Sequence, residues 1–129
     1  MMSYHFSKTV NYTYEKAIER ATEELKKEGF GVLTEIDVQD TLKKKINADF
    51  HPYKILGACN PQFAYKALTA ENKIGTMLPC NVIVQQHPDG KVEVSAVDPV
   101  ASMSAIKNDN LGSVAIEVRA KLKKVIDNI

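Results

Sequence analysis

The segment CNVIVQQHPDGKVEVSAV, residues 80–97, predicts two β-strands joined by a tight turn. Apolar and polar residues alternate on both sides of HPDG, and Asp89-Gly90 suits a type I turn that ends in a glycine bulge. The alternation gives the hairpin one apolar face, made of Val82, Val84, Val92, Val94 and Ala96. Because Glu93 and Ser95 fall on the opposite face, we expect only one side of the hairpin to pack against helices.

Three further strands are predicted outside the hairpin, at about residues 3–11, 32–38 and 55–59. Helices are expected from the Thr13 cap to the Gly29 stop, after Asp37 or Asp40, over residues 61–71, near Ser102, and from Leu111 to Ile129. The second of these should bury Leu42 and Ile46, and the third should bury Ala64, Ala67 and Leu68. This order of elements indicates an α+β fold with a largely antiparallel sheet of about five strands, helices on one face and a long C-terminal helix.

Length and charge restrict the class of protein. A chain of 129 residues fits one domain, over residues 1–129. Its net charge of +1 lacks the excess of positive charge typical of nucleic-acid binders, so we expect no nucleic acid as a partner. We find neither a secretory signal nor eighteen successive apolar residues, so we expect a soluble, cytoplasmic protein without a membrane partner.

The two cysteines form the one candidate site, because each is followed by an asparagine: Cys59-Asn60 and Cys80-Asn81. If the strands that end at Cys59 and begin at Cys80 are antiparallel, both thiols lie at the same edge of the sheet. If the helix between them is a βαβ crossover, the thiols lie at opposite ends. The hairpin would return Asp98 to this edge, and Gly57 would permit a close approach. The candidate ligand-binding residues are Gly57, Cys59, Asn60, Cys80, Asn81 and Asp98.

All of these residues except Gly57 also have a structural explanation, and for Asn81 it is a hydrogen bond to the backbone of a loop. Asn60, which precedes Pro61, can cap a helix, and Asp98 can cap another before Pro99. Free cysteines are among the most buried residues, and burial opposes the thiolate that a helix N-terminus would favour at Cys59. No catalytic residue is assigned by these patterns.

The sequence gives little support for a metal site or for a catalytic histidine. No C-x-x-C occurs, and His5, His51 and His87 lack the usual ligand spacing, so we expect no metal site. A Cys-His catalytic pair needs direct hydrogen-bond contact, which the separate positions of these residues do not predict. The cofactor stays unknown.

Several short motifs occur together in this chain: ILGACNP (55–61), IG (74–75), LPCNV (78–82), DG (89–90) and DP (98–99). In this order they resemble the bacterial and archaeal domain of unknown function 302. The resemblance covers nearly the whole chain and implies a curved antiparallel sheet, a long C-terminal helix and small, dimeric members, but no reaction. AENKIG (70–75) lacks a proline expected shortly before the isoleucine, so this loop departs from the family pattern.

Two hypotheses about function follow. The first is a non-catalytic ligand-binding or interaction domain, with a small-molecule ligand near the two Cys-Asn steps. We expect it to be a homodimer, because Leu33, Leu56 and Ile83 fall on strand faces opposite their core neighbours. The alternative is a thiol-based redox or metal-handling protein, which needs Cys59 and Cys80 within bridging reach.

Overall fold

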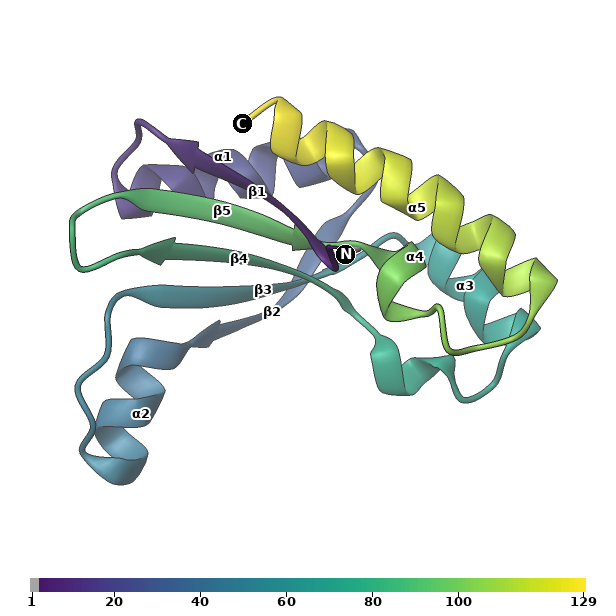
Figure 1. The fold of residues 1–129 in the computed structure, drawn as a ribbon, viewed down its shortest axis with the longest axis horizontal. Helices are drawn as coiled ribbons and strands as arrows, with labels where there is room; N and C mark the ends of the chain where they lie inside the picture. Colours follow the sequence, from purple (N-terminus) through teal and green to yellow (C-terminus); the bar gives the residue numbers. More distant parts are fainter. Residues whose placement is uncertain (1–2) are drawn as a thin grey trace.

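The computed structural model describes residues 3–129 and confirms the α+β fold (Figure 1). The strands are β1 (His5–Val10), β2 (Gly31–Asp37), β3 (Tyr53–Cys59), β4 (Cys80–Gln86) and β5 (Val92–Val97). The helices are α1 (Tyr14–Lys27), α2 (Val38–Ile46), α3 (Pro61–Ala70), α4 (Pro99–Ser102) and α5 (Asp109–Asp127). A short 3-10 helix, η1, covers Ile74–Met77.

The strands form one open sheet in the order β1-β5-β4-β3-β2, and every neighbouring pair is antiparallel. The predicted hairpin is confirmed at its centre, where Val84 of β4 lies opposite Val94 of β5. Figure 1 shows α1 and α5 side by side over one face of this sheet. In the part of the chain that the structure describes, the other face of β1, β5 and β4 carries a hollow.

The core lies between the hairpin and these two helices. The apolar face predicted for the hairpin is buried, and Leu25 of α1 and Leu122 of α5 are fully buried against it. Burial of such side chains stabilises the fold by about 1.5–3 kcal/mol each. The predicted alternation therefore identified the face of the sheet that carries the helices.

Helix ends agree with the capping residues. The Thr13 hydroxyl accepts a hydrogen bond of 3.1 Å from the Lys16 amide at the start of α1, and Gly29 has a φ of +88° after its end. The C-terminal helix begins two residues earlier than Leu111, because the Asn108 side chain accepts hydrogen bonds from the Asn110 and Leu111 amides.

Three burial predictions are wrong. Ile46 is 68% exposed and Leu42 only half-buried, because α2 contacts β2 and β3 but lies away from the other helices (Figure 1). In α3, Ala67 is buried as predicted, Ala64 is half-buried, and Leu68 is 43% exposed. Leu56 does not face away from the core: it is opposite Val82 and fully buried. The apolar run around Leu56 is continuous, so its sequence does not distinguish the two faces of the strand.

Candidate functional site: an apolar cavity beside two thiols

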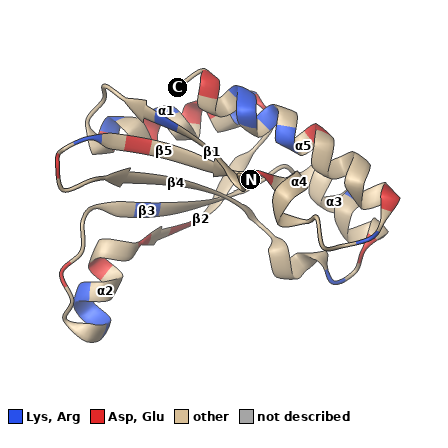
Figure 2. Cartoon of the chain, viewed as in Figure 1, with Lys and Arg blue, Asp and Glu red and all other residues tan. Residues whose placement is uncertain are grey.

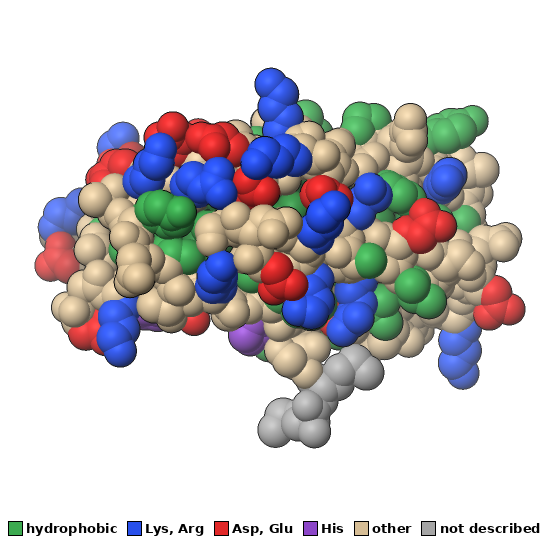
Figure 3. Space-filling model, turned by 90° about the horizontal axis from the view of Figure 1, so that it is seen from above, with side chains coloured by type: hydrophobic (Ala, Val, Ile, Leu, Met, Phe, Trp, Pro, Cys, Tyr) green, Lys and Arg blue, Asp and Glu red, His purple; other side chains and the backbone are tan. Residues whose placement is uncertain are grey.

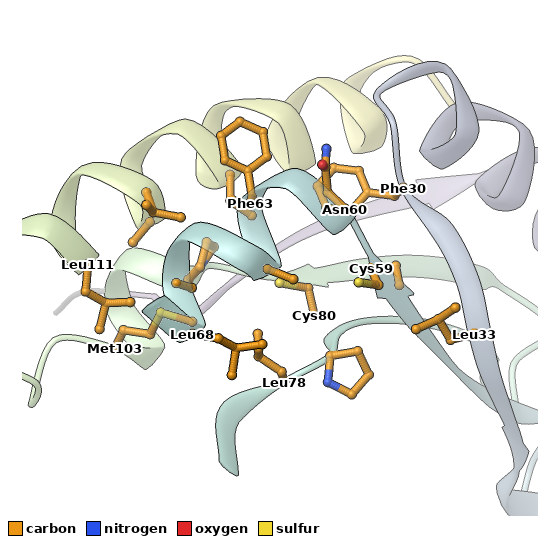
Figure 4. Close-up of a pocket in the computed structure, with 18 of the residues that line it drawn as sticks. Phe30, Leu33, Cys59, Asn60, Phe63, Leu68, Leu78, Cys80, Met103 and Leu111 are labelled. Atoms are coloured by element: carbon orange, nitrogen blue, oxygen red, sulfur yellow. The ribbon is translucent and has the colours of Figure 1, made fainter. Parts of the chain in front are cut away.

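A cavity of about 320 Å³ opens at the end of the sheet where β3 ends and β4 begins (Figure 4). Its walls come from β2, α3, the segment before β4, α4 and α5. Aromatic and aliphatic side chains make most of its surface, among them Phe30, Phe63, Leu78, Met103, Leu111 and Val118. A concave apolar site of this size is typical of small-molecule binding.

The register of β3 and β4 brings both Cys-Asn steps to this end of the sheet. Ala58 lies opposite Cys80, so Cys59 is one residue beyond the pair. The two strands are antiparallel, which is the arrangement that places both thiols at the same edge of the sheet. The alternative, a βαβ crossover with parallel strands, is excluded. Cys59, Asn60 and Cys80 all line the cavity.

Gly57 supports the site from within the sheet instead of lining it. A Cβ atom at this position would collide with Thr34 Oγ1 and lie 2.8 Å from Cγ of Pro79. Thr34 and Pro79 both line the cavity. Glycine at position 57 therefore lets two wall residues pack directly against the backbone of β3.

Both thiols are free and half-buried. The pKa of the Cys80 thiol is raised to about 11, mainly because the thiol is buried and to a smaller extent because Cys59 is near. Cys80 is therefore protonated at neutral pH and presents a weakly polar S–H group to the cavity.

Asn60 does not use its side chain to cap α3, contrary to the structural explanation given above. The residue occupies the N-cap position, but its Nδ2 donates a 3.3 Å hydrogen bond to the carbonyl oxygen of Glu28. This bond joins the start of α3 to the turn after α1. The Asn60 side chain thereby provides a polar group at the edge of the cavity.

Asn81 and Asp98 lie elsewhere. Asn81 borders a separate hollow on the open face of the sheet. Asp98 is buried; its Oδ1 accepts hydrogen bonds of 3.0 and 3.4 Å from the Val100 and Ala101 amides, and its Oδ2 pairs with Arg119 Nε at 3.1 Å. The cap predicted for Asp98 is confirmed, and Arg119 compensates its charge.

Most of the cavity wall was not predicted. Phe30 and Phe63 come from segments far apart in the sequence, and no local motif marks either of them. Leu111, Ala115 and Val118 were predicted as the apolar face of the last helix. Their helical spacing gave no sign that part of this face borders a cavity instead of packed core.

Charged side chains are absent from the set that lines the cavity. Figure 2 shows that charges concentrate on α1, α2 and α5, and α4 carries none. On the helix-covered face Lys and Arg side chains are interspersed with Asp and Glu (Figure 3).

Within residues 3–129, no group of three or more His, Cys, Asp or Glu side chains is placed to hold a metal ion. No helix in the described part of the chain has the length and apolar character to cross a bilayer.

Comparisons with known proteins agree with this architecture. A solved structure described as an uncharacterised conserved DUF302 protein from Bacillus stearothermophilus is similar to this chain, with 31% sequence identity and a TM-score of 0.91. The match covers 98% of each chain. No curated protein matches. The family model described as "Domain of unknown function DUF302" matches residues 6–129, which confirms the resemblance, and the chain therefore belongs to this family.

Proposed function

We propose that this protein is a non-catalytic binding domain whose cavity takes a small, uncharged and mainly apolar molecule. The observation that carries the proposal is the cavity itself, which has a volume of about 320 Å³ and a wall made mainly of apolar side chains. Transfer of apolar ligand surface from water into such a site is favourable by about 25 cal/mol per Å².

The few polar groups of the wall restrict the ligand further. Thr34, Asn60 and the two thiols provide hydroxyl, amide and S–H groups, and no lysine, arginine or carboxylate is present to balance an ionised ligand. Burial of an unpaired charge is costly, so acids and amines should be rejected. A molecule with an apolar body and at most one neutral polar group, directed toward Asn60, fits these restrictions.

The test is a titration of the protein with toluene and with 1-octanol, followed by methyl NMR spectra and thermal unfolding. Both probes should shift the resonances of Leu78, Leu111 and Val118 and should raise Tm, because a ligand that binds only the native state stabilises it. Neither benzoate nor octylamine, which are charged at neutral pH, should do so.

Ala64→Phe is the matched variant, because Ala64 lines the cavity from the outer half of α3. The larger ring should fill the site and weaken toluene binding by about tenfold or more, which corresponds to about 1.4 kcal/mol. Ala120→Phe, at an exposed position of α5 away from the cavity, controls for the change in hydrophobicity. Equal toluene affinity in both variants, or no saturable shift in the unmodified protein, would contradict the proposal.

A thiol-based function is the second candidate, because Cys59 and Cys80 border one cavity and Cys59 contributes to the raised pKa of Cys80. In such a function the two thiols would lose two protons and two electrons to an oxidant and form one S–S bond. The test is oxidation with diamide followed by the intact mass. Two thiols that stay free in the folded protein would exclude it, whereas rapid bridge formation would favour it over simple binding.

We also infer that the protein forms a homodimer through β2. This strand is at an edge of the sheet, and its Leu33 and Ile36 are 69% and 48% exposed. Neither lysine nor proline, which commonly block pairing at sheet edges, occurs in β2. Glu35 and Asp37 do add charge to this edge, so the interface would depend on the exposed apolar residues. Leu56, which contributed to the same expectation, gives no support because it is buried in the core.

A further inference from the structure

A second hollow, of about 450 Å³, lies on the face of the sheet opposite the helices. It shares no lining residue with the apolar cavity. Its floor follows adjacent positions of three strands, where Ser7 of β1 lies opposite Ser95 of β5 and Ser95 lies opposite Ile83 of β4. The floor combines the hydroxyls of Ser7 and Ser95 with apolar residues such as Ile83, and this mixed surface contrasts with the apolar wall of the first cavity. The two sites would therefore select different ligands.

A chain of short hydrogen bonds crosses this floor. His5 Nδ1 and Ser7 Oγ are 2.7 Å apart, and Ser7 Oγ and Ser95 Oγ are also 2.7 Å apart. The bonds can run in either direction, because the imidazole nitrogen and both hydroxyls can donate or accept. Ser95, which is 7% exposed, can therefore offer either a proton or a lone pair to a molecule in the hollow.

Two tyrosines border the same hollow from opposite sides. Tyr4 precedes β1 and is 70% exposed, and Tyr53 begins β3. Burial is the larger cause, and the nearby Tyr4 the smaller one, of the raised pKa of Tyr53, so this phenol stays protonated at neutral pH. Aromatic faces in this position can cover the apolar side of a ring-shaped ligand.

The remaining polar groups of the rim are mostly neutral. Asn81 is exposed, and Gln85 Oε1 is 2.9 Å from His51 Nε2, which leaves the Gln85 amide nitrogen available to the hollow. The one carboxylate of the lining, Glu93, is 3.2 Å from His87 Nε2. Mixed donors and acceptors with little uncompensated charge match hydroxyl groups, each of which both donates and accepts.

We propose that this hollow binds a neutral, hydroxyl-rich ring of the size of a monosaccharide, stacked on Tyr4 and hydrogen-bonded through its hydroxyls to Ser95, Asn81 and Gln85. The proposal is independent of the apolar cavity. Anionic ligands lack a partner of opposite charge here, and Glu93, the one carboxylate of the lining, is already within hydrogen-bond distance of His87. Purely apolar ligands would leave the Ser95 hydroxyl and the side-chain amides without hydrogen bonds.

The test is an NMR titration of the full-length protein with D-glucose, D-galactose, D-ribose and myo-inositol. At least one of these probes should give saturable amide shifts centred on Ser95, Asn81 and Gln85, while Leu111 and Val118 of the apolar cavity stay unchanged. Toluene should give the opposite pattern, so failure of either site can be distinguished from failure of the other.

Two variants and two matched controls make the test specific. Tyr4→Ala and Asn81→Ala should each weaken the best probe about fivefold or more, as the loss of one stacking contact or one hydrogen bond implies. Tyr65→Ala and Asn72→Ala, at exposed positions outside the hollow, should leave its affinity unchanged. The absence of shifts for all four probes would overturn the proposal, as would shifts that persist unchanged in Tyr4→Ala and Asn81→Ala.

Discussion

At the scale of single residues, the two cysteines occupy positions that look equivalent in the sequence, since each precedes an asparagine. In the structure the asparagines differ: Asn60 lines the apolar cavity, whereas Asn81 borders the hollow on the other face. Adjacent residues of a strand point to opposite faces of the sheet, so Cys80 and Asn81 border different sites. Cys59 is the last residue of its strand, and Asn60 after it can therefore line the same cavity. The two Cys-Asn sequences therefore predicted correctly that both cysteines lie at one edge of the sheet, but they did not predict that the two asparagines border different sites.

The Cys80 thiol gives a prediction about pH. Since burial raises its pKa to about 11 from an ordinary value of 9.0, the native state holds this proton between pH 9 and pH 11 while the unfolded chain releases it. The free energy of unfolding should therefore fall over this interval, because the unfolded state binds fewer protons. Cys80→Ala should remove this part of the pH dependence.

The measurement is urea unfolding of the unmodified protein and of Cys80→Ala at several values between pH 7 and pH 11. Cys59→Ala is the control, because it retains the Cys80 thiol. In the folded protein, alkylation of Cys80 by iodoacetamide should also be slow at pH 7 and should accelerate as the pH approaches 11. Rapid alkylation of Cys80 at pH 7 would contradict the assignment of a protonated, buried thiol.

At the scale of elements, the hairpin and α5 were predicted correctly because each has a complete local pattern. Val82, Val84, Val92 and Val94 alternate with period two, and the apolar residues from Leu111 to Ile129 recur at helical spacing. For α2 the same kind of pattern predicted burial of Ile46, which is exposed. Periodicity shows which face of a helix is apolar but not whether the rest of the fold covers it.

The exposed side of β2 leads to a prediction about assembly. Ile36→Lys should convert the proposed dimer to a monomer, since a charged side chain would replace an exposed apolar one on the inferred interface strand. Thr9→Lys places the same charge on β1, at the other edge of the sheet, and should leave the dimer intact. Light scattering after size exclusion measures both masses, and a monomeric unmodified protein would refute the inference.

At the scale of the whole molecule, the sequence indicated the fold class, the antiparallel sheet and the end of the sheet where Cys59 and Cys80 meet. It did not indicate a cavity, because the wall is assembled from Phe30, Phe63 and Leu111, which are distant in the chain. A cavity is space that side chains fail to fill, and such packing depends on all elements together. The apolar wall therefore became visible only with the tertiary structure.

The proposed binding function requires a cavity that is accessible, apolar and able to hold a small uncharged molecule. The most direct test is a crystal of the unliganded protein pressurised with xenon, which enters dry apolar cavities. We predict a xenon atom in van der Waals contact with Phe63, Leu78 and Leu111. Density showing this space filled by side chains, or by ordered water bound to polar groups, would contradict the account.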